Sequence, residues 1–208
     1  MDENDRGPYL SPHEIETRSQ RLLKRIREAW RGVHLGRGIS IEDAELEIFS
    51  PRESVARRKK HTGDKEYMRQ FSDWTAVDLE SNAYEMPIDR PFEFLDPEAF
   101  RYYIPVFIRS WLQAGLPAMQ NYDESRVSRD PEERLSWFML CHTTDVEYVQ
   151  GQARRLNGDQ RRCVAEFFAL ALESGIFPDD EDWPAVMKLW GKDLDEDHVK
   201  RLERLLSG

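Results

Sequence analysis

Apolar residues recur at intervals of three and four positions along most of the chain, a spacing that predicts helices. The clearest stretch begins at Asp96-Pro97, where Asp96 suits an N-cap and Pro97 the first helical position. Pro105 lies inside the stretch and removes one backbone donor, so we expect a kink in this central helix. Gly115 ends it. The apolar positions are Phe100, Tyr103, Ile104, Phe107, Ile108, Trp111 and Leu112.

Similar spacing predicts other helices, each beginning at a capping signal or a tryptophan. Ser11 and Glu14 have the spacing of a capping box, in which each residue satisfies a backbone donor of the other. Residues 75–92 hold two prolines and little periodicity, and we interpret them as an ordered connector. The predicted starts are Ser11, Ser40, Asp130, Asn157, Trp183 and Asp195.

About seven helices and almost no alternating pattern make the prediction all-α, a single compact multi-helix domain with a kinked central helix. The length of 208 residues fits one domain. We expect residues 1–175 to form the helical core. Residues 176–208 are expected to form a C-terminal helical extension packed on that core.

The charge balance favours some partners over others. Forty acidic residues outweigh thirty basic ones, which gives a formal net charge of −10 and a pI near 5.1. A negative field repels phosphate backbones and anionic lipid, so nucleic acid and membranes are poor partners and a basic protein is a better one. The oligomeric state is left open by the sequence.

Cysteine use and the first residues bear on the compartment. Two cysteines, Cys141 and Cys163, are too few to staple a domain of this size, which favours a reducing compartment. The acidic first residues lack the apolar segment of a signal peptide, and no apolar run approaches the length needed to cross a bilayer. We therefore expect a cytoplasmic protein.

The motifs of common catalytic sites are missing from the sequence. No phosphate-binding glycine loop, dinucleotide fingerprint or zinc spacing occurs, and no two histidines are four residues apart. Cys141, His142 and Asp145 are close in sequence, but neighbouring residues point apart on a helix, and a polar cluster at a helix end is the better interpretation. We therefore predict no catalytic residue, no metal and no cofactor.

An acidic loop is the first candidate binding surface. It consists of Asp179, Asp180, Glu181 and Asp182, and a second acidic stretch holds Asp193, Asp195, Glu196 and Asp197. Neither has the ligand spacing or the glycine of a calcium loop. Solvated charge near helix N-termini explains such runs, and a docking surface for a basic partner is the functional alternative.

Arg101 and Tyr102 are the second candidate site. They lie beside Pro105, where a kink could open a groove, and an arginine flanked by phenols suits an anion or a carboxylate. The structural alternative places Tyr103 in the core and lets Arg101 and Tyr102 hold the connector through Asp78 or Asp89.

The segment Phe94-Leu95-Asp96-Pro97-Glu98-Ala99-Phe100-Arg101-Tyr102-Tyr103-Ile104-Pro105 resembles the central motif of an uncharacterised bacterial family of small helical proteins. Looser matches are Ala44-Glu45, Asp73-Trp74 and Gln160. The resemblance covers about residues 12–172. It implies a bacterial helical protein and assigns no catalytic residue.

We therefore expect a non-catalytic bacterial protein-binding protein, for example an immunity or inhibitor protein against a basic toxin or effector. The alternative is an enzyme or a small-ligand-binding domain with a pocket near the central kinked helix. A third possibility is a structural module that assembles through its last helix, residues 195–206.

Overall fold

The computed structural model describes residues 9–35, 95–110, 112, 146–175 and 183–207. Within them the chain is helical and contains no strand, so the all-α prediction is confirmed. The helices predicted near Ser40 and Asp130 fall outside the described residues. The elements are α1 (Pro12–Ala29), α5 (Pro97–Ser110), α8 (Val146–Ala153), α9 (Gly158–Glu173), α10 (Trp183–Trp190), the short 3-10 helix η6 (Gly191–Asp193) and α11 (Glu196–Leu206).

Helix α1 begins at the predicted capping box. The Glu14 amide donates to the Ser11 hydroxyl over 3.4 Å, and the Ser11 amide donates to the Glu14 carboxylate over 2.9 Å. Two hydrogen bonds from Ser11 lower the pKa of Glu14, and the bond from the Ser11 side chain has a larger effect than the bond from its backbone. The helix ends before Gly32, whose φ of +73° suits glycine. Its buried face consists of Ile15, Ser19, Leu22, Leu23 and Ile26.

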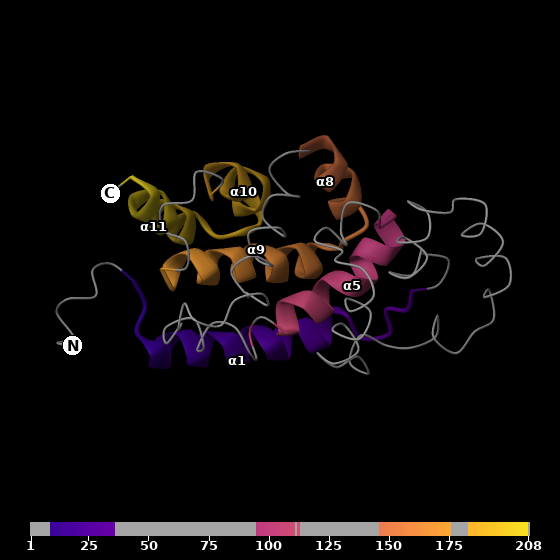
Figure 1. Cartoon of the computed structure of the whole chain (residues 1–208), viewed down its shortest axis with the longest axis horizontal. Helices are drawn as coiled ribbons and strands as arrows, with labels where there is room; N and C mark the ends of the chain where they lie inside the picture. Colours follow the sequence, from indigo (N-terminus) through magenta and orange to yellow (C-terminus); the bar gives the residue numbers. More distant parts are fainter. Residues whose placement is uncertain (1–8, 36–94, 111, 113–145, 176–182, 208) are drawn as a thin grey trace, which may run out of the picture.

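Helix α9 lies at the centre of the described fold, between α1 on one side and α10 and α11 on the other (Figure 1). It opens with a second capping box, between Asn157 and Gln160. Eleven of its sixteen residues are buried, as expected for a helix covered on several sides. At its end Gly175 has a φ of +72°, and a Cβ there would lie 3.1 Å from the Tyr9 ring.

Helix α5 begins as predicted, because the Asp96 side chain accepts from the Ala99 amide over 2.9 Å and Pro97 is the first helical residue. The helix continues past Pro105 to Ser110 without interruption, and the kink stays a prediction. Helix α8 packs against α5, and the buried Gln152 side chain donates to the Leu95 carbonyl over 2.7 Å. This bond fixes the start of α5 against α8.

The core is rich in aromatic side chains. Trp30, Trp183 and Trp190 are fully buried, and the rings of Phe168 and Trp190 stack with centroids 6.2 Å apart. Through these contacts α10 shares one hydrophobic cluster with α1, α5 and α9. No helix in the described part of the chain has the length and apolar character needed to span a membrane. The proposed boundary between residues 175 and 176 stays a prediction.

Candidate functional site

The predicted site residues have different positions in the structure. The Tyr102 side chain is fully buried and meets Tyr103 edge to face, with ring centroids 4.9 Å apart. Arg101 is partly exposed. The predicted acidic loop, Asp179–Asp182, lies outside the described residues, and so does the polar cluster of Cys141, His142 and Asp145. A ligand at the surface of α5 would therefore meet Arg101 but not the buried Tyr102 ring.

Arg101 holds three helices together. Its Nε donates to the Gln160 side-chain oxygen over 3.1 Å, and its carbonyl accepts from the Trp30 indole over 2.6 Å. Gln160, itself fully buried, also donates to the Ala29 carbonyl over 3.0 Å. We name Ala29, Trp30, Arg101 and Gln160 the helix junction, because they connect α1, α5 and α9. The sequence-based alternative had Arg101 bonded to Asp78 or Asp89, both outside the described residues; the partner seen here is Gln160.

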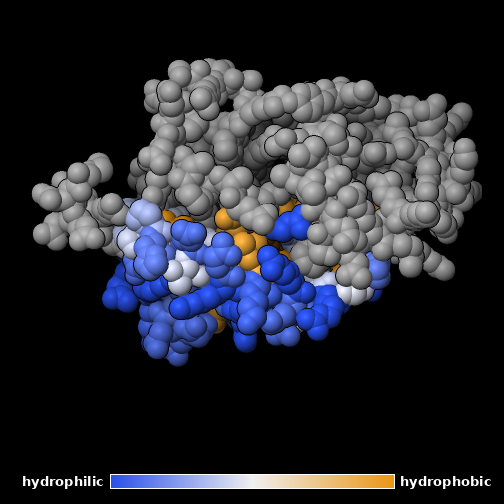
Figure 2. Space-filling model, turned by 90° about the horizontal axis from the view of Figure 1, so that it is seen from below, coloured by the Kyte–Doolittle hydropathy of each residue, from blue (hydrophilic) through white to orange (hydrophobic). Residues whose placement is uncertain are grey.

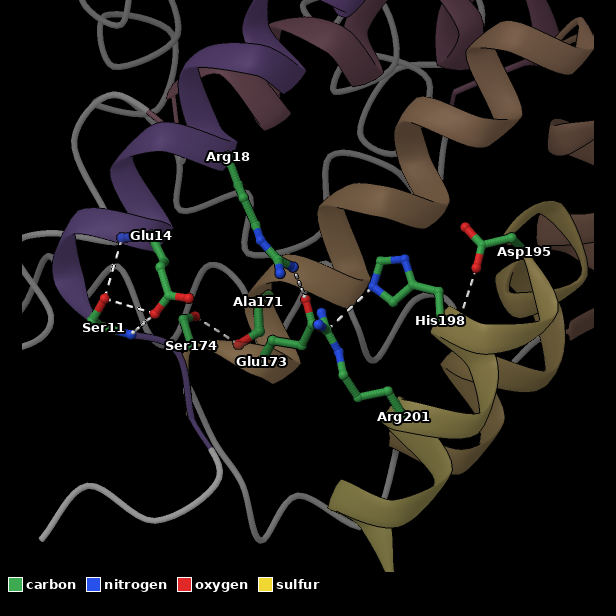
Figure 3. Close-up of polar contacts among 9 residues, drawn as sticks. All are labelled: Ser11, Glu14, Arg18, Ala171, Glu173, Ser174, Asp195, His198 and Arg201. Atoms are coloured by element: carbon green, nitrogen blue, oxygen red, sulfur yellow. Dashed lines mark hydrogen bonds and ion pairs between the residues drawn. The ribbon is translucent and has the colours of Figure 1, made fainter. Parts of the chain in front are cut away.

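The sequence reasoning did not anticipate a second cluster, around the buried carboxylate of Glu173 (Figure 3). This side chain is only 3% exposed and ends α9. Arg18 of α1 approaches it with Nη1 2.7 Å from Oε2. Arg201 and His198 of α11 approach its other oxygen, and His198 Nε2 lies 3.3 Å from it. The cluster therefore fastens α1 and α11 to the end of α9.

Burial changes the titration of this cluster. Removal from water lowers the pKa of His198 below its ordinary value, and it lowers the pKa of Arg201 as well. The imidazole is therefore mostly neutral at neutral pH. Arg18 and Arg201 supply the cations that pair with Glu173.

A second ion pair repeats the first one two helical turns away. Arg25 pairs with Glu166, and its pKa is raised mainly by that hydrogen bond. Arg25 lies seven residues after Arg18, and Glu166 lies seven residues before Glu173, so α1 and α9 run antiparallel in a constant register. Seven residues further along, the register would place residue 32 opposite Asp159. No ion pair forms there, because α1 ends at Ala29 and residue 32 is glycine. The spacing of seven in both helices is visible in the sequence, but it does not tell which two helices face one another.

Two hollows lie on either side of the ion pair between Arg25 and Glu166. Both residues of the pair line both hollows. The first has a volume of about 210 Å³ and we name it the arginine hollow. It is lined by Arg18, Arg21, Leu22, Arg25, Glu166, Leu170, Glu173 and His198. The second has a volume of about 620 Å³ and we name it the acidic hollow. It is lined by Arg25, Asp159, Arg162, Glu166, Asp193, Leu194 and Asp195.

The acidic hollow contains carboxylates with and without cationic partners. Asp193 of η6 receives two hydrogen bonds from Arg161 of α9, at 3.0 and 2.7 Å. Asp195 caps α11 by accepting from the His198 amide over 2.8 Å. Neither Asp159 nor Asp195 forms an ion pair with any residue that the structure describes. These two exposed carboxylates are available to a cation.

Two features of the described residues concern their reactivity and their metal-binding capacity. Cys163 is buried in α9, and burial raises its pKa to about 12, so its thiol stays protonated near neutral pH. Among the described residues, no three His, Cys, Asp or Glu side chains gather closely enough to hold a metal ion. The described surface on the α1 side is predominantly hydrophilic (Figure 2). Such a surface offers charged groups to a ligand or a partner.

Comparison with known proteins assigns the chain to a family. The model of a family described as "Family of unknown function (DUF6714)" matches residues 18–194. This span includes the helix junction, both ion pairs between α1 and α9, and the acidic hollow up to Leu194. No curated protein and no solved structure matches the chain.

Proposed function

We propose that the chain, which belongs to the family of unknown function DUF6714, is a non-catalytic protein that binds a basic protein partner. The observation that carries the proposal is the acidic hollow. Four carboxylates line it against two guanidinium groups, and Asp159 and Asp195 are left without a cation among the described residues. A lysine or arginine side chain entering the hollow would form charge-assisted hydrogen bonds with them.

The carboxylates of Asp159 and Asp195 help to stabilise their own helices, and this role still leaves them able to bind a cation. Asp159 lies in the first turn of α9 and Asp195 caps α11, positions where a carboxylate favours the helix. Both residues nevertheless remain exposed. A carboxylate oxygen that caps an amide still has lone pairs for a cation from another molecule.

The hollow would form one part of a larger contact. A stable protein interface buries about 1,600 Å² in total, which is much more than one hollow provides. The exposed first turn of α11, with Glu196 and Asp197, extends the acidic surface beside it. Because exposed charges act mainly on the rate of encounter, we expect the acidic surface to speed association more than it slows dissociation.

The biological form of this proposal is an immunity or inhibitor protein in the cytoplasm of a bacterium, directed against a basic toxin or effector. Its support is the net charge of −10 together with the acidic hollow. Asp179, Asp180, Glu181 and Asp182 are proposed to bind the same basic partner.

The test is affinity capture from a lysate of the source organism with tagged protein, followed by mass spectrometry. The same capture is repeated with Asp179, Asp180, Glu181 and Asp182 changed to lysine. We expect one basic protein that is captured by the native chain and lost with the variant. Capture of acidic proteins alone, or of none above background, would count against the proposal.

A further inference from the structure

The arginine hollow differs in charge from the acidic hollow. Arg18 pairs with Glu173 and Arg25 pairs with Glu166, while Arg21 forms no ion pair with any described residue. Arg201 adds a further cation to Glu173. Cations therefore outnumber carboxylates here, although the whole chain carries a net charge of −10.

The guanidinium groups of the hollow have N–H hydrogen-bond donors that the ion pairs do not use. The pair with Glu173 occupies Nη1 of Arg18, and the pair with Glu166 occupies Nη1 of Arg25. Each guanidinium carries five N–H donors, so both retain several, and none of the five of Arg21 is bonded to a residue that the structure describes. Arg18, Arg21 and Arg25 lie three and four residues apart on α1, which places them on one face of the helix.

Besides the three arginines, the two paired carboxylates and His198, the lining contains two apolar side chains, and the space is small. Leu22 of α1 and Leu170 of α9, each 3% exposed, belong to the lining. A volume of about 210 Å³ is below the range of drug-sized pockets, roughly 300–1,000 Å³. At about 30 Å³ per water molecule it corresponds to roughly seven waters, which suits a short chain with a few heavy atoms.

We propose that the arginine hollow binds a carboxylate carried on a short apolar group. Arg21 is its ion-pair partner, Arg18 and Arg25 add hydrogen bonds through their open donors, and Leu22 and Leu170 contact the apolar part. A carboxylate fits this lining because a guanidinium presents two parallel donors to its two oxygens. The carboxylate has two possible sources, a free small acid or the carboxyl terminus of another polypeptide.

The test follows the methyl NMR signals of Leu22 and Leu170 while hexanoate is added at constant ionic strength and neutral pH. Hexanol and hexylamine are the matched probes without the negative charge. Two short peptides that end in leucine, one with a free carboxylate and one with an amide, test the second source. The protein variants are Arg21→Gln and the control Lys24→Gln, which removes the same charge from an exposed position of α1 outside the hollow.

We expect hexanoate to shift both leucine signals in a saturable way, and hexanol and hexylamine not to. Arg21→Gln should weaken binding about tenfold, the size of one charge-assisted hydrogen bond, while Lys24→Gln leaves it within about twofold. If the peptide with a free carboxylate binds more tightly than hexanoate, and the peptide amide does not bind, the site is assigned to a carboxyl terminus. If hexanoate binds more tightly than the peptide acid, the site is assigned to a free acid. The proposal is overturned if neither acid binds, if hexanol or hexylamine binds as well as hexanoate, or if the two variants behave alike.

Discussion

Arg101 and Gln160 are 59 positions apart in the chain, and a 3.1 Å hydrogen bond joins the Nε of Arg101 to the side-chain oxygen of Gln160. Both are residues on which the resemblance to a helical family rested. The same Gln160 oxygen accepts from the Asn157 amide over 3.1 Å, and its nitrogen donates to the Ala29 carbonyl. Arg101 therefore contributes to the assembly of the helices. The structural alternative considered for it, a bond to the connector through Asp78 or Asp89, falls outside the described residues.

Gln160→Ala is expected to lower the free energy of unfolding by about 2–4 kcal/mol, since three part-buried groups lose a partner at once. The matched control is Gln20→Ala, at an exposed position of α1, which should change it by less than about 0.5 kcal/mol. Urea denaturation measures both. An effect of Gln160→Ala no larger than that of the control would show that the helix junction does not stabilise the fold.

Arg18→Met is expected to destabilise the protein more than Arg25→Met, although both remove one cation from α1. The Glu173 side chain is 3% exposed, whereas the Glu166 side chain is 26% exposed and can regain water. The expected losses are about 1–3 kcal/mol for Arg18→Met and at most about 1 kcal/mol for Arg25→Met. The two unfolding curves, measured side by side, check the order, and equal losses would contradict it.

His198→Gln is expected to flatten the dependence of stability on pH below neutrality. Burial lowers the pKa of His198, outweighing Asp195 and Glu166, which raise it, while Arg18 lowers it further; the Glu173 carboxylate also faces the ring. The unfolded chain therefore binds a proton at a higher pH than the folded chain. The free energy of unfolding falls as the pH drops through about 6.5 and levels off below the folded-state pKa.

The check is urea denaturation of the native chain and of His198→Gln between about pH 7.5 and pH 5.5. Carboxylates contribute at lower pH and are common to both proteins, so the difference between the two profiles isolates the imidazole. A native chain that loses no more stability than the variant across this range would show that His198 is not held in its neutral form.

Cys163 is expected to resist alkylation while the protein is folded. With a pKa of about 12 and a side chain that is 1% exposed, about one thiol in ten thousand is ionised at pH 8. Labelling with iodoacetamide, resolved peptide by peptide in a mass spectrometer, should modify Cys163 only in denaturant. Labelling at the same rate with and without denaturant would place the thiol at an accessible surface.

Local signals in the sequence predicted the helix starts well, because a cap depends on residues within three positions of one another. The bonds at Ser11, Asp96 and Asn157 follow from such signals. The pairs between α1 and α9 join residues 141 and 155 positions apart, and periodicity tells which face of a helix is buried but not which helix covers it. Glu173 illustrates the difficulty, since a charged residue in an apolar helix gives no indication of the arginines that neutralise it.

The measurement that tests the binding proposal most directly is the affinity capture repeated with two charge-matched variants. Asp159→Asn with Asp195→Asn removes the open carboxylates of the acidic hollow, and asparagine still caps α11. Glu16→Gln with Glu203→Gln removes the same charge from exposed positions outside the hollow. We expect a basic partner to be captured by the native chain and by the second variant and to be lost with the first. Equal capture by both variants, or no basic partner at all, would contradict it.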